Sequence, residues 1–354
     1  MEGASVTAFR LSVLLLTLLV ADGYHTCSHH KVGPTVTQVT APVNHGEGPH
    51  WDAETGVLFF VDIASELVNK YDPATNEVTH AQFVGGGVTL VIPVKGTKTQ
   101  QLLTTRGHDV ILVNWNQQNA TFDSTTNVNN VTVIATVETE ANKSGNRWND
   151  GKADVNGRLW AGTMGPEPIV GQVTPDQGAF YLLKPDTKPI TEVTPVSISN
   201  GLAWNRDNTL LYYIDTATDQ VDVFDFNLEQ ATISNRRKVF NLQENGVAGH
   251  PDGMTIDSNE NLWIACFDGG QVINVNPYSG ELIQSVPIPA SRVTSAMFGG
   301  PHLDTLYVTT SRLGLSDEEQ QQQPLAGSVF AITGLGVSAL APANNALPNL
   351  GKHK

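Results

Sequence analysis

The fold of this chain is decided by the stretch PDGMTIDSNENLWIACFD, which occupies residues 251–268. In it, Asp252 stands five residues ahead of Asp257 and ten ahead of Leu262, which opens an apolar run. The same spacing occurs at three earlier places. Because equal spacing within repeats means equal position in a repeated structure, we expect the four leading side chains to converge on a common axis. The earlier sets are Glu47, Asp52 and Val57; Asn149, Asp154 and Leu159; and Asn200, Asn205 and Leu210.

Short apolar runs recur six times along the chain, at intervals of roughly fifty residues, which is typical of propeller blades. Gly, Asn, Asp and Pro separate the runs, and a sustained helical period does not appear. The sequence therefore predicts an all-β fold, a six-bladed β-propeller spanning residues 35–354 as one domain. The glutamine-rich segment at residues 320–324 is expected to be a surface loop. The six runs begin at Val57, Gln101, Leu159, Leu210, Leu262 and Leu306.

The four leading residues, Glu47, Asn149, Asn200 and Asp252, offer two carboxylates and two amides to the centre of the propeller. Hard oxygen ligands of this kind are typical of a divalent-cation site. The alternative is a water-filled channel that polar side chains merely line. That alternative explains the polarity, but it explains less well why neither Lys nor Arg stands at the same register. We therefore favour a central metal-binding channel.

Two further residues are candidates for contact with a substrate. Arg147 stands two residues before Asn149, so on a strand the two side chains point the same way. A cation there suits substrate hydroxyls, a carboxylate or a phosphate, whereas a salt bridge with Asp150 or Asp154 is the structural alternative. Glu167 lies between two prolines in an expected loop at the channel mouth, where a carboxylate can accept hydrogen bonds from a polyol.

The catalytic motifs that the sequence lacks exclude several types of reaction. The sequence has neither a serine nucleophile elbow nor a phosphate-binding glycine loop nor a His-rich zinc signature. A divalent ion can polarise a carbonyl oxygen and activate water, and Asp252 can serve as general base. This combination fits hydrolysis of an ester, lactone or phosphoester better than redox chemistry. The formal charge of −15 argues against nucleic acid as a partner.

The N-terminal residues indicate export. In residues 1–23, Arg10 is followed by an apolar run too short to span a bilayer and then by small residues, as in a cleaved secretory signal; an uncleaved anchor is the alternative. Residues 24–34 are expected to be a flexible leader. Cleavage would leave a secreted, extracellular protein without a membrane segment. Three glycosylation sequons agree with export, and they begin at Asn119, Asn130 and Asn142.

The chain has only two cysteines, Cys27 and Cys266. A secreted chain with two cysteines can close one disulfide. The alternative, which we favour, is a buried thiol at Cys266 and a free or intermolecular thiol at Cys27. We therefore do not expect cross-links to stabilise the fold.

Several segments resemble the signatures of one family, the senescence marker protein/gluconolactonase/luciferin-regenerating enzyme family, also called regucalcin-like. The matches follow in order over nearly the whole chain after the N-terminal segment. They are GEGPHW at 46–51, NRWNDGK at 146–152, SNGLAW at 199–204, YYID at 212–215, SNRR at 234–237, PDGM at 251–254, FGG at 298–300 and ITGLGV at 332–337.

The resemblance implies a six-bladed propeller with one catalytic divalent metal ion, which is Ca, Zn, Mn or Mg. By motif, Glu47, Asn200 and Asp252 are similar to the metal ligands, with Asp252 also the acid/base residue. Arg147, Asn149 and Glu167 are similar to the positions that contact substrate. Familiar vertebrate members are cytosolic, so the signal and the sequons mark a departure. Residues 48–50 are closer to the insect luciferin-regenerating branch.

The sequence thus predicts a secreted divalent-metal-dependent hydrolase of lactones or related cyclic esters, with a small lactone or polyol-like substrate. One alternative is a non-catalytic secreted protein that binds calcium or a small ligand. A luciferin-regenerating type of enzyme is another.

Overall fold

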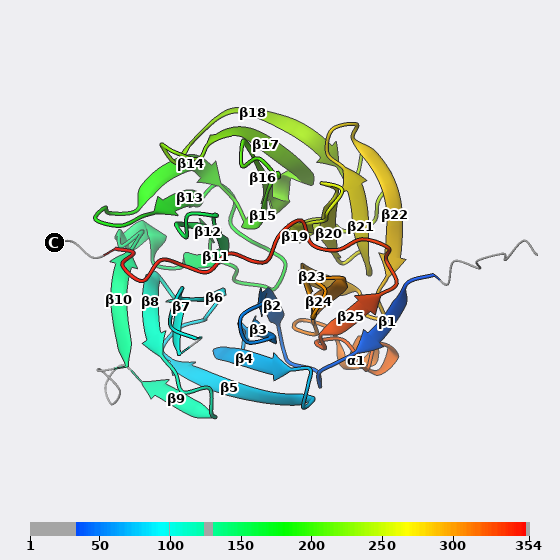
Figure 1. The fold of residues 1–354 in the computed structure, drawn as a ribbon, viewed down its shortest axis with the longest axis horizontal. Helices are drawn as coiled ribbons and strands as arrows, with labels where there is room; N and C mark the ends of the chain where they lie inside the picture. The colour runs from blue at the N-terminus through cyan, green and yellow to red at the C-terminus, as the bar shows by residue number, and fades with distance from the viewer. Residues whose placement is uncertain (1–32, 99, 124–129, 352–354) are drawn as a thin grey trace, which may run out of the picture. The chain divides into compact units, whose positions relative to one another are not determined.

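The computed structural model describes residues 33–98, 100–123 and 130–351. Their strands form six sheets that stand as blades around a common centre (Figure 1). The four strands nearest the centre of each blade pair antiparallel with their neighbours. The prediction of an all-β, six-bladed β-propeller is confirmed.

The bounds of the strands follow the order of the blades, from the channel outward. Blade one has β2 (Gly46–Asp52), β3 (Val57–Asp62), β4 (Leu67–Asp72), β5 (Glu77–Val84) and β9 (Ala120–Asp123); blade two has β6 (Val91–Pro93), β7 (Gln101–Arg106), β8 (Asp109–Asn114) and β10 (Val131–Thr136). Blade three has β11 (Arg147–Ala153), β12 (Leu159–Met164), β13 (Gly178–Leu183) and β14 (Ile190–Val196); blade four has β15 (Ser199–Trp204), β16 (Leu210–Asp215), β17 (Gln220–Asn227) and β18 (Thr232–Asn241). Blade five has β19 (His250–Ile256), β20 (Leu262–Phe267), β21 (Gln271–Asn276) and β22 (Glu281–Pro287); blade six has β23 (Arg292–Gly299), β24 (Thr305–Ser311), β25 (Phe330–Thr333) and β1 (Thr35–Gln38).

The ring of blades is closed by the two ends of the propeller domain. Strand β1 pairs antiparallel with β25, so the outermost strand of blade six comes from the beginning of the domain. This closure gives the edge of blade six a hydrogen-bonded partner.

Blade one carries an additional strand. After β8 the chain crosses to the outer edge of blade one, where β9 pairs parallel with β5, and it then returns to blade two as β10. Strand β9 therefore covers the edge that β5 would otherwise leave unpaired. The sequence reading did not foresee this excursion.

Each repeat has an Asp or Asn five positions after its converging side chain. This residue stabilises the turn that follows the inner strand through side-chain hydrogen bonds. Asp257 is fully buried, and its Oδ1 accepts hydrogen bonds from the backbone N–H groups of Asn259 and Asn261. Its Oδ2 accepts one from Trp263 Nε1 at 2.9 Å. Asp154 makes the same contact with Trp160 at 3.0 Å. The regular spacing in the sequence thus reflects a structural cap on each turn, and both tryptophans are buried packing residues.

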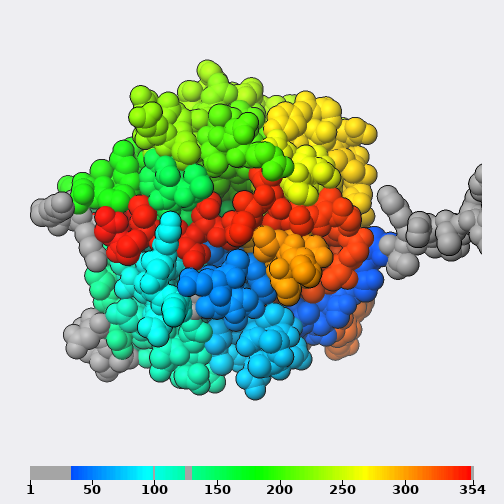
Figure 2. Space-filling view, viewed as in Figure 1, coloured from blue at the N-terminus to red at the C-terminus, as the bar shows by residue number. Residues whose placement is uncertain are grey.

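The last part of the chain, residues 334–351, lies across one face of the blades, and we call it the C-terminal strap (Figure 2). It forms a parallel bridge between Ala346 and Val94 of blade two and an antiparallel bridge between Ala339 and Asp257 of blade five. Leu350 in the strap is fully buried. The strap touches turns that follow the inner strands, so it closes the end of the channel at which the inner strands finish.

One local expectation was wrong. Residues 320–324 were expected to be a loop, but α1 (Asp317–Gln322) includes the first three of them. The helix begins with a capping box, in which Ser316 Oγ accepts from Glu319 N and the Glu319 carboxylate accepts from Ser316 N. This reciprocal pair satisfies two backbone donors that a helix end leaves unpaired. Within the described residues, no helix is long and apolar enough to cross a membrane.

The predictions for the N-terminus fall outside the described residues, because the signal segment, nearly all of the leader and Cys27 lie in residues 1–32. Cys266 in β20 is fully buried. The pairing of the two cysteines therefore stays a prediction. The three sequon asparagines, Asn119, Asn130 and Asn142, are exposed.

His50 connects the inner strand of blade one to the strap and predicts a pH effect on stability. Its side chain is buried, and its Nε2 lies 3.2 Å from Asn345 Oδ1. Burial lowers the pKa of His50 from 6.5 to about 4. As the pH falls, the His50 ring is therefore protonated near pH 6.5 in the unfolded chain but only near pH 4 in the folded protein. The contribution of His50 to stability is complete above pH 6.5 and is lost as pH falls toward 4.

We expect the free energy of unfolding of the wild type to fall as the pH is lowered through this window. In His50→Gln, whose amide can still donate to Asn345, the fall should be smaller by up to about 3 kcal/mol. Urea unfolding at a series of pH values measures the difference. His302→Gln is the control, because His302 is exposed. An identical pH dependence in His50→Gln and wild type contradicts the prediction.

Candidate functional site

Each inner strand that carries a candidate residue is interrupted by a β-bulge at that residue. The register between β19 and β20 shifts between Pro251 and Met254, which places Asp252 in the bulge. The same shift occurs around Asn149 in β11 and around Asn200 in β15, and in β2 it begins at Glu47. A bulge leaves residues unpaired and re-aims their side chains. The repeated bulge therefore turns these side chains into the channel.

All six of the predicted site residues line one cavity of about 560 Å³. It lies at the end of the channel where the inner strands begin, away from the strap. The expectation that the four leading side chains converge is confirmed. The cavity is lined by Glu47, Arg147, Asn149, Glu167, Asn200 and Asp252, among others.

The amide of Asn200 is fixed by a short chain of hydrogen bonds. Its Nδ2 donates to Thr216 Oγ1 at 2.8 Å, and that hydroxyl donates to the Pro251 carbonyl at 2.8 Å. Asn149 Nδ2 donates to the Ser199 carbonyl at 2.9 Å and lies 3.3 Å from Asn200 Oδ1. These contacts fix the orientation of both amides, with the Asn200 oxygen accepting from Asn149. Asn200 lines the same cavity as Glu47 and Asp252.

Arg147 contacts two other candidate residues that line the cavity, Asn149 and Glu167. Its Nη1 donates to Asn149 Oδ1 at 2.6 Å, as expected for side chains two positions apart. Its Nη2 lies 3.8 Å from Glu167 Oε2. The alternative of a salt bridge with Asp150 or Asp154 is wrong, because the carboxylate within ion-pair distance is Glu167. The guanidinium is thus held on two sides while it lines the cavity.

The loop at residues 165–177 carries Glu167 and forms part of the cavity wall. Glu167 Oε1 accepts from Gly171 N at 2.6 Å, which closes the loop on itself. Val170 packs so closely on Gly314 of blade six that a Cβ at Gly314 would lie 3.0 Å from the valine side chain. Blades three and six are opposite each other in the ring, so this loop reaches across the mouth of the cavity.

The carboxylates of Glu47 and Asp252 are buried and lie near each other. Each is only 7 % exposed. Burial raises the pKa of Glu47, and the nearby Asp150 raises it further. Burial also raises the pKa of Asp252 well above its usual range, and the charges of Glu47 and Asp150 add to the effect. Two negative charges in this position need a compensating cation.

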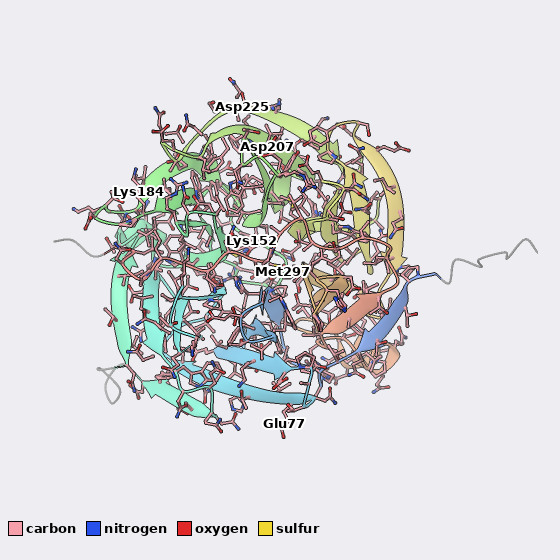
Figure 3. The ribbon with its side chains drawn as sticks, viewed as in Figure 1. Glu77, Lys152, Lys184, Asp207, Asp225 and Met297 are labelled. Carbon is pink, nitrogen blue, oxygen red and sulfur yellow. The ribbon has the colours of Figure 1, made fainter. Side chains whose placement is uncertain are left out.

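Two charged residues that the sequence reading missed, Asp150 and Lys152, lie in the same part of the channel. Asp150 is buried and Lys152 is half-buried, and both lie close enough to Glu47 to affect its pKa. Burial lowers the pKa of Lys152 to about 8, while Asp150 and Glu47 oppose that shift. Lys152 lies near the centre of the view in Figure 3. Asp150 follows Asn149 in the same bulge, so the loss of strand alternation there conceals it from a period-two pattern.

The spacing of two that identified Arg147 also identifies further residues of the cavity. His45 stands two before Glu47, Ile198 two before Asn200 and His250 two before Asp252, and all three line it. His45 Nδ1 lies 2.8 Å from Ser311 Oγ, and His250 Nδ1 lies 2.5 Å from Asp219 Oδ1. Applied to every repeat, the alternation of a strand would have found them.

The side chains around Glu47 and Asp252 offer oxygen ligands that a metal ion could use. Among the described residues, no group of three or more His, Cys, Asp or Glu side chains is placed to hold one. The expected ligand set instead combines two carboxylates, those of Glu47 and Asp252, with the amide of Asn200. Nearby, the buried Asp150 Oδ2 has no hydrogen-bond partner. Mutually repelling carboxylates, an oriented amide oxygen and an unpaired carboxylate oxygen fit a hard divalent cation.

The region from residue 45 to residue 312 matches the model of the SMP-30/Gluconolactonase/LRE-like region. The chain belongs to this family. Human regucalcin is 39% identical over 300 residues, which cover 84% of this chain and 93% of the human protein. A solved luciferin-regenerating enzyme is 36% identical with a TM-score of 0.81, and covers 89% of this chain and 100% of its own.

A more distant structure extends the comparison of the fold. A calcium-binding regucalcin from Agrobacterium tumefaciens has a TM-score of 0.73 at 22% identity, over 88% of this chain and 96% of its own. At this identity the likeness shows the fold alone. The resemblance to the regucalcin-like family that the sequence motifs suggested is thus confirmed.

Proposed function

We propose that this chain hydrolyses lactones or related cyclic esters in the 560 Å³ cavity and that it requires one divalent cation there. The observation that carries the proposal is the meeting of Glu47, Asn200 and Asp252 with Arg147, Asn149 and Glu167 in that one cavity. The family includes gluconolactonases by its description, which agrees with this reaction type.

Glu47, Asn200 and Asp252 would hold the cation, which is Ca, Zn, Mn or Mg. When bound, such an ion polarises a carbonyl oxygen and makes water more acidic. The buried carboxylates supply the negative charge that attracts it, and the Asn200 oxygen is held in place through Thr216.

The other residues act on the substrate and on protons. Arg147 has its guanidinium fixed between Asn149 and Glu167, so it presents its remaining N–H donors in one orientation. These donors bind substrate oxygens. Asp252 takes a proton from the attacking water and returns it to the ring oxygen as the ester bond opens. The product is the open hydroxy acid.

Replacing Asp252 by Asn tests the reaction. The amide keeps the shape of the side chain but cannot take a proton, so we expect kcat to fall at least about 100-fold. Initial rates with gluconolactone and with a simple δ-lactone, in Ca, Mg, Mn or Zn, measure the effect. Asp207→Asn is the control, since this carboxylate is exposed and does not line the cavity. Wild-type turnover in Asp252→Asn would falsify the proposed role.

A second candidate is a non-catalytic protein that binds calcium or a small ligand, and the relatives named regucalcin favour it. Calorimetric titration of the same cations, with and without each lactone, separates the two. Cation binding without turnover of a broad lactone panel supports the binding protein. Turnover that a chelator removes supports the hydrolase.

We also propose that the protein is secreted and carries N-linked glycans at Asn119, Asn130 and Asn142. Exposure of all three asparagines is compatible with modification. Asn119 Oδ1 accepts from His80 N at 3.0 Å, which leaves its Nδ2 for the sugar. Expression in an insect or mammalian secretory cell should place the protein in the medium.

Treatment with an N-glycosidase should then increase its electrophoretic mobility. In Asn142→Gln the shift should become smaller by one glycan, and the triple Gln variant should show none. Retention in the cytosol, or equal mobility before and after treatment, contradicts the proposal.

A further inference from the structure

The outer part of the cavity differs in character from its inner end. The inner end holds the carboxylates, the amides and Arg147. The mouth is instead lined by apolar side chains from loops and a strand end of five of the six blades. These side chains are half-buried and belong to Ile63, Val170, Val173, Ile198, Phe267 and Leu313.

Several polar groups at the mouth are already engaged by the protein. The His45 ring contacts Ser311, and the His250 ring contacts Asp219. Asp268 pairs with Arg292 at 3.0 Å. Because these groups have protein partners, the apolar side chains between them provide surface for a ligand. The mouth is therefore suited to an apolar group rather than to further hydroxyls.

The loop at residues 165–177 encloses this apolar part. Val170 lines the cavity and also packs against Gly314 on the opposite side of the mouth. Its neighbour Ile169 points away, is 60% exposed and does not line the cavity. A group bound beneath Val170 is thus removed from water, and the volume of about 560 Å³ lies in the range of sites that enclose drug-sized ligands.

We propose that the substrates are lactones that carry an apolar alkyl or aryl substituent, with the ester group at the polar inner end and the substituent under Val170, Phe267 and Leu313. This inference rests on the proposed hydrolase function. Water adds to the carbonyl carbon, the ring C–O bond breaks, and the ring oxygen receives the proton. The substituent is unchanged and leaves with the hydroxy acid.

The test is kcat/KM for a homologous series of γ-lactones with alkyl chains of increasing length, beside gluconolactone. Each methylene that the mouth buries should raise kcat/KM by about fourfold until the mouth is filled. In Val170→Asn this dependence on chain length should flatten, because the polar side chain removes apolar surface from the mouth. Ile169→Asn is the matched control in the same loop and should retain the wild-type dependence.

Leu313→Asn, on the other side of the mouth, is a second variant that should also flatten the series, and thermal melting checks that each variant is folded. A wild-type kcat/KM that does not depend on chain length, with gluconolactone preferred, overturns the inference and leaves the hydrolase intact. Absence of turnover for every lactone overturns the proposed function and the inference with it.

Discussion

The structure depends on one repeated backbone feature, the β-bulge near the beginning of the inner strands. In a regular strand, alternate side chains would pack between neighbouring blades. The bulge at Asp252, and its equivalents at Glu47, Asn149 and Asn200, instead direct a polar side chain into the channel. The bulges let one fold combine tightly packed blades with a polar centre, because the backbone irregularity is confined to a few residues per blade.

This geometry buries more negative than positive charge in the channel. Glu47, Asp252 and Asp150 are buried close together, and Arg147 and Lys152 compensate only part of their charge. Burial disfavours ionised groups unless a partner of opposite charge is near. The divalent cation that we propose would supply the missing positive charge in the cavity that Glu47, Asn200 and Asp252 line. The same cavity then changes to apolar side chains at its mouth, so polar chemistry and substrate selection are separated along one axis.

Much of the fold and of the candidate site could be predicted from the sequence because both follow the repeat. Asp252 and its three counterparts were found by spacing, although Asp257 and its equivalents in that pattern are turn caps. Asp150 was missed because a bulge breaks the alternation on which the prediction relied. The course of β9 and the position of the strap were also missed, since both depend on contacts between distant blades that leave no local pattern.

The most direct test of the account is the anomalous signal of manganese in crystals soaked with Mn²⁺. The account predicts a single strong peak in the channel, bounded by the carboxylates of Glu47 and Asp252 and by the amide oxygen of Asn200, and no such peak in Glu47→Gln crystals. Wild-type crystals with an empty channel, or with manganese bound only at the outer surface, would contradict it.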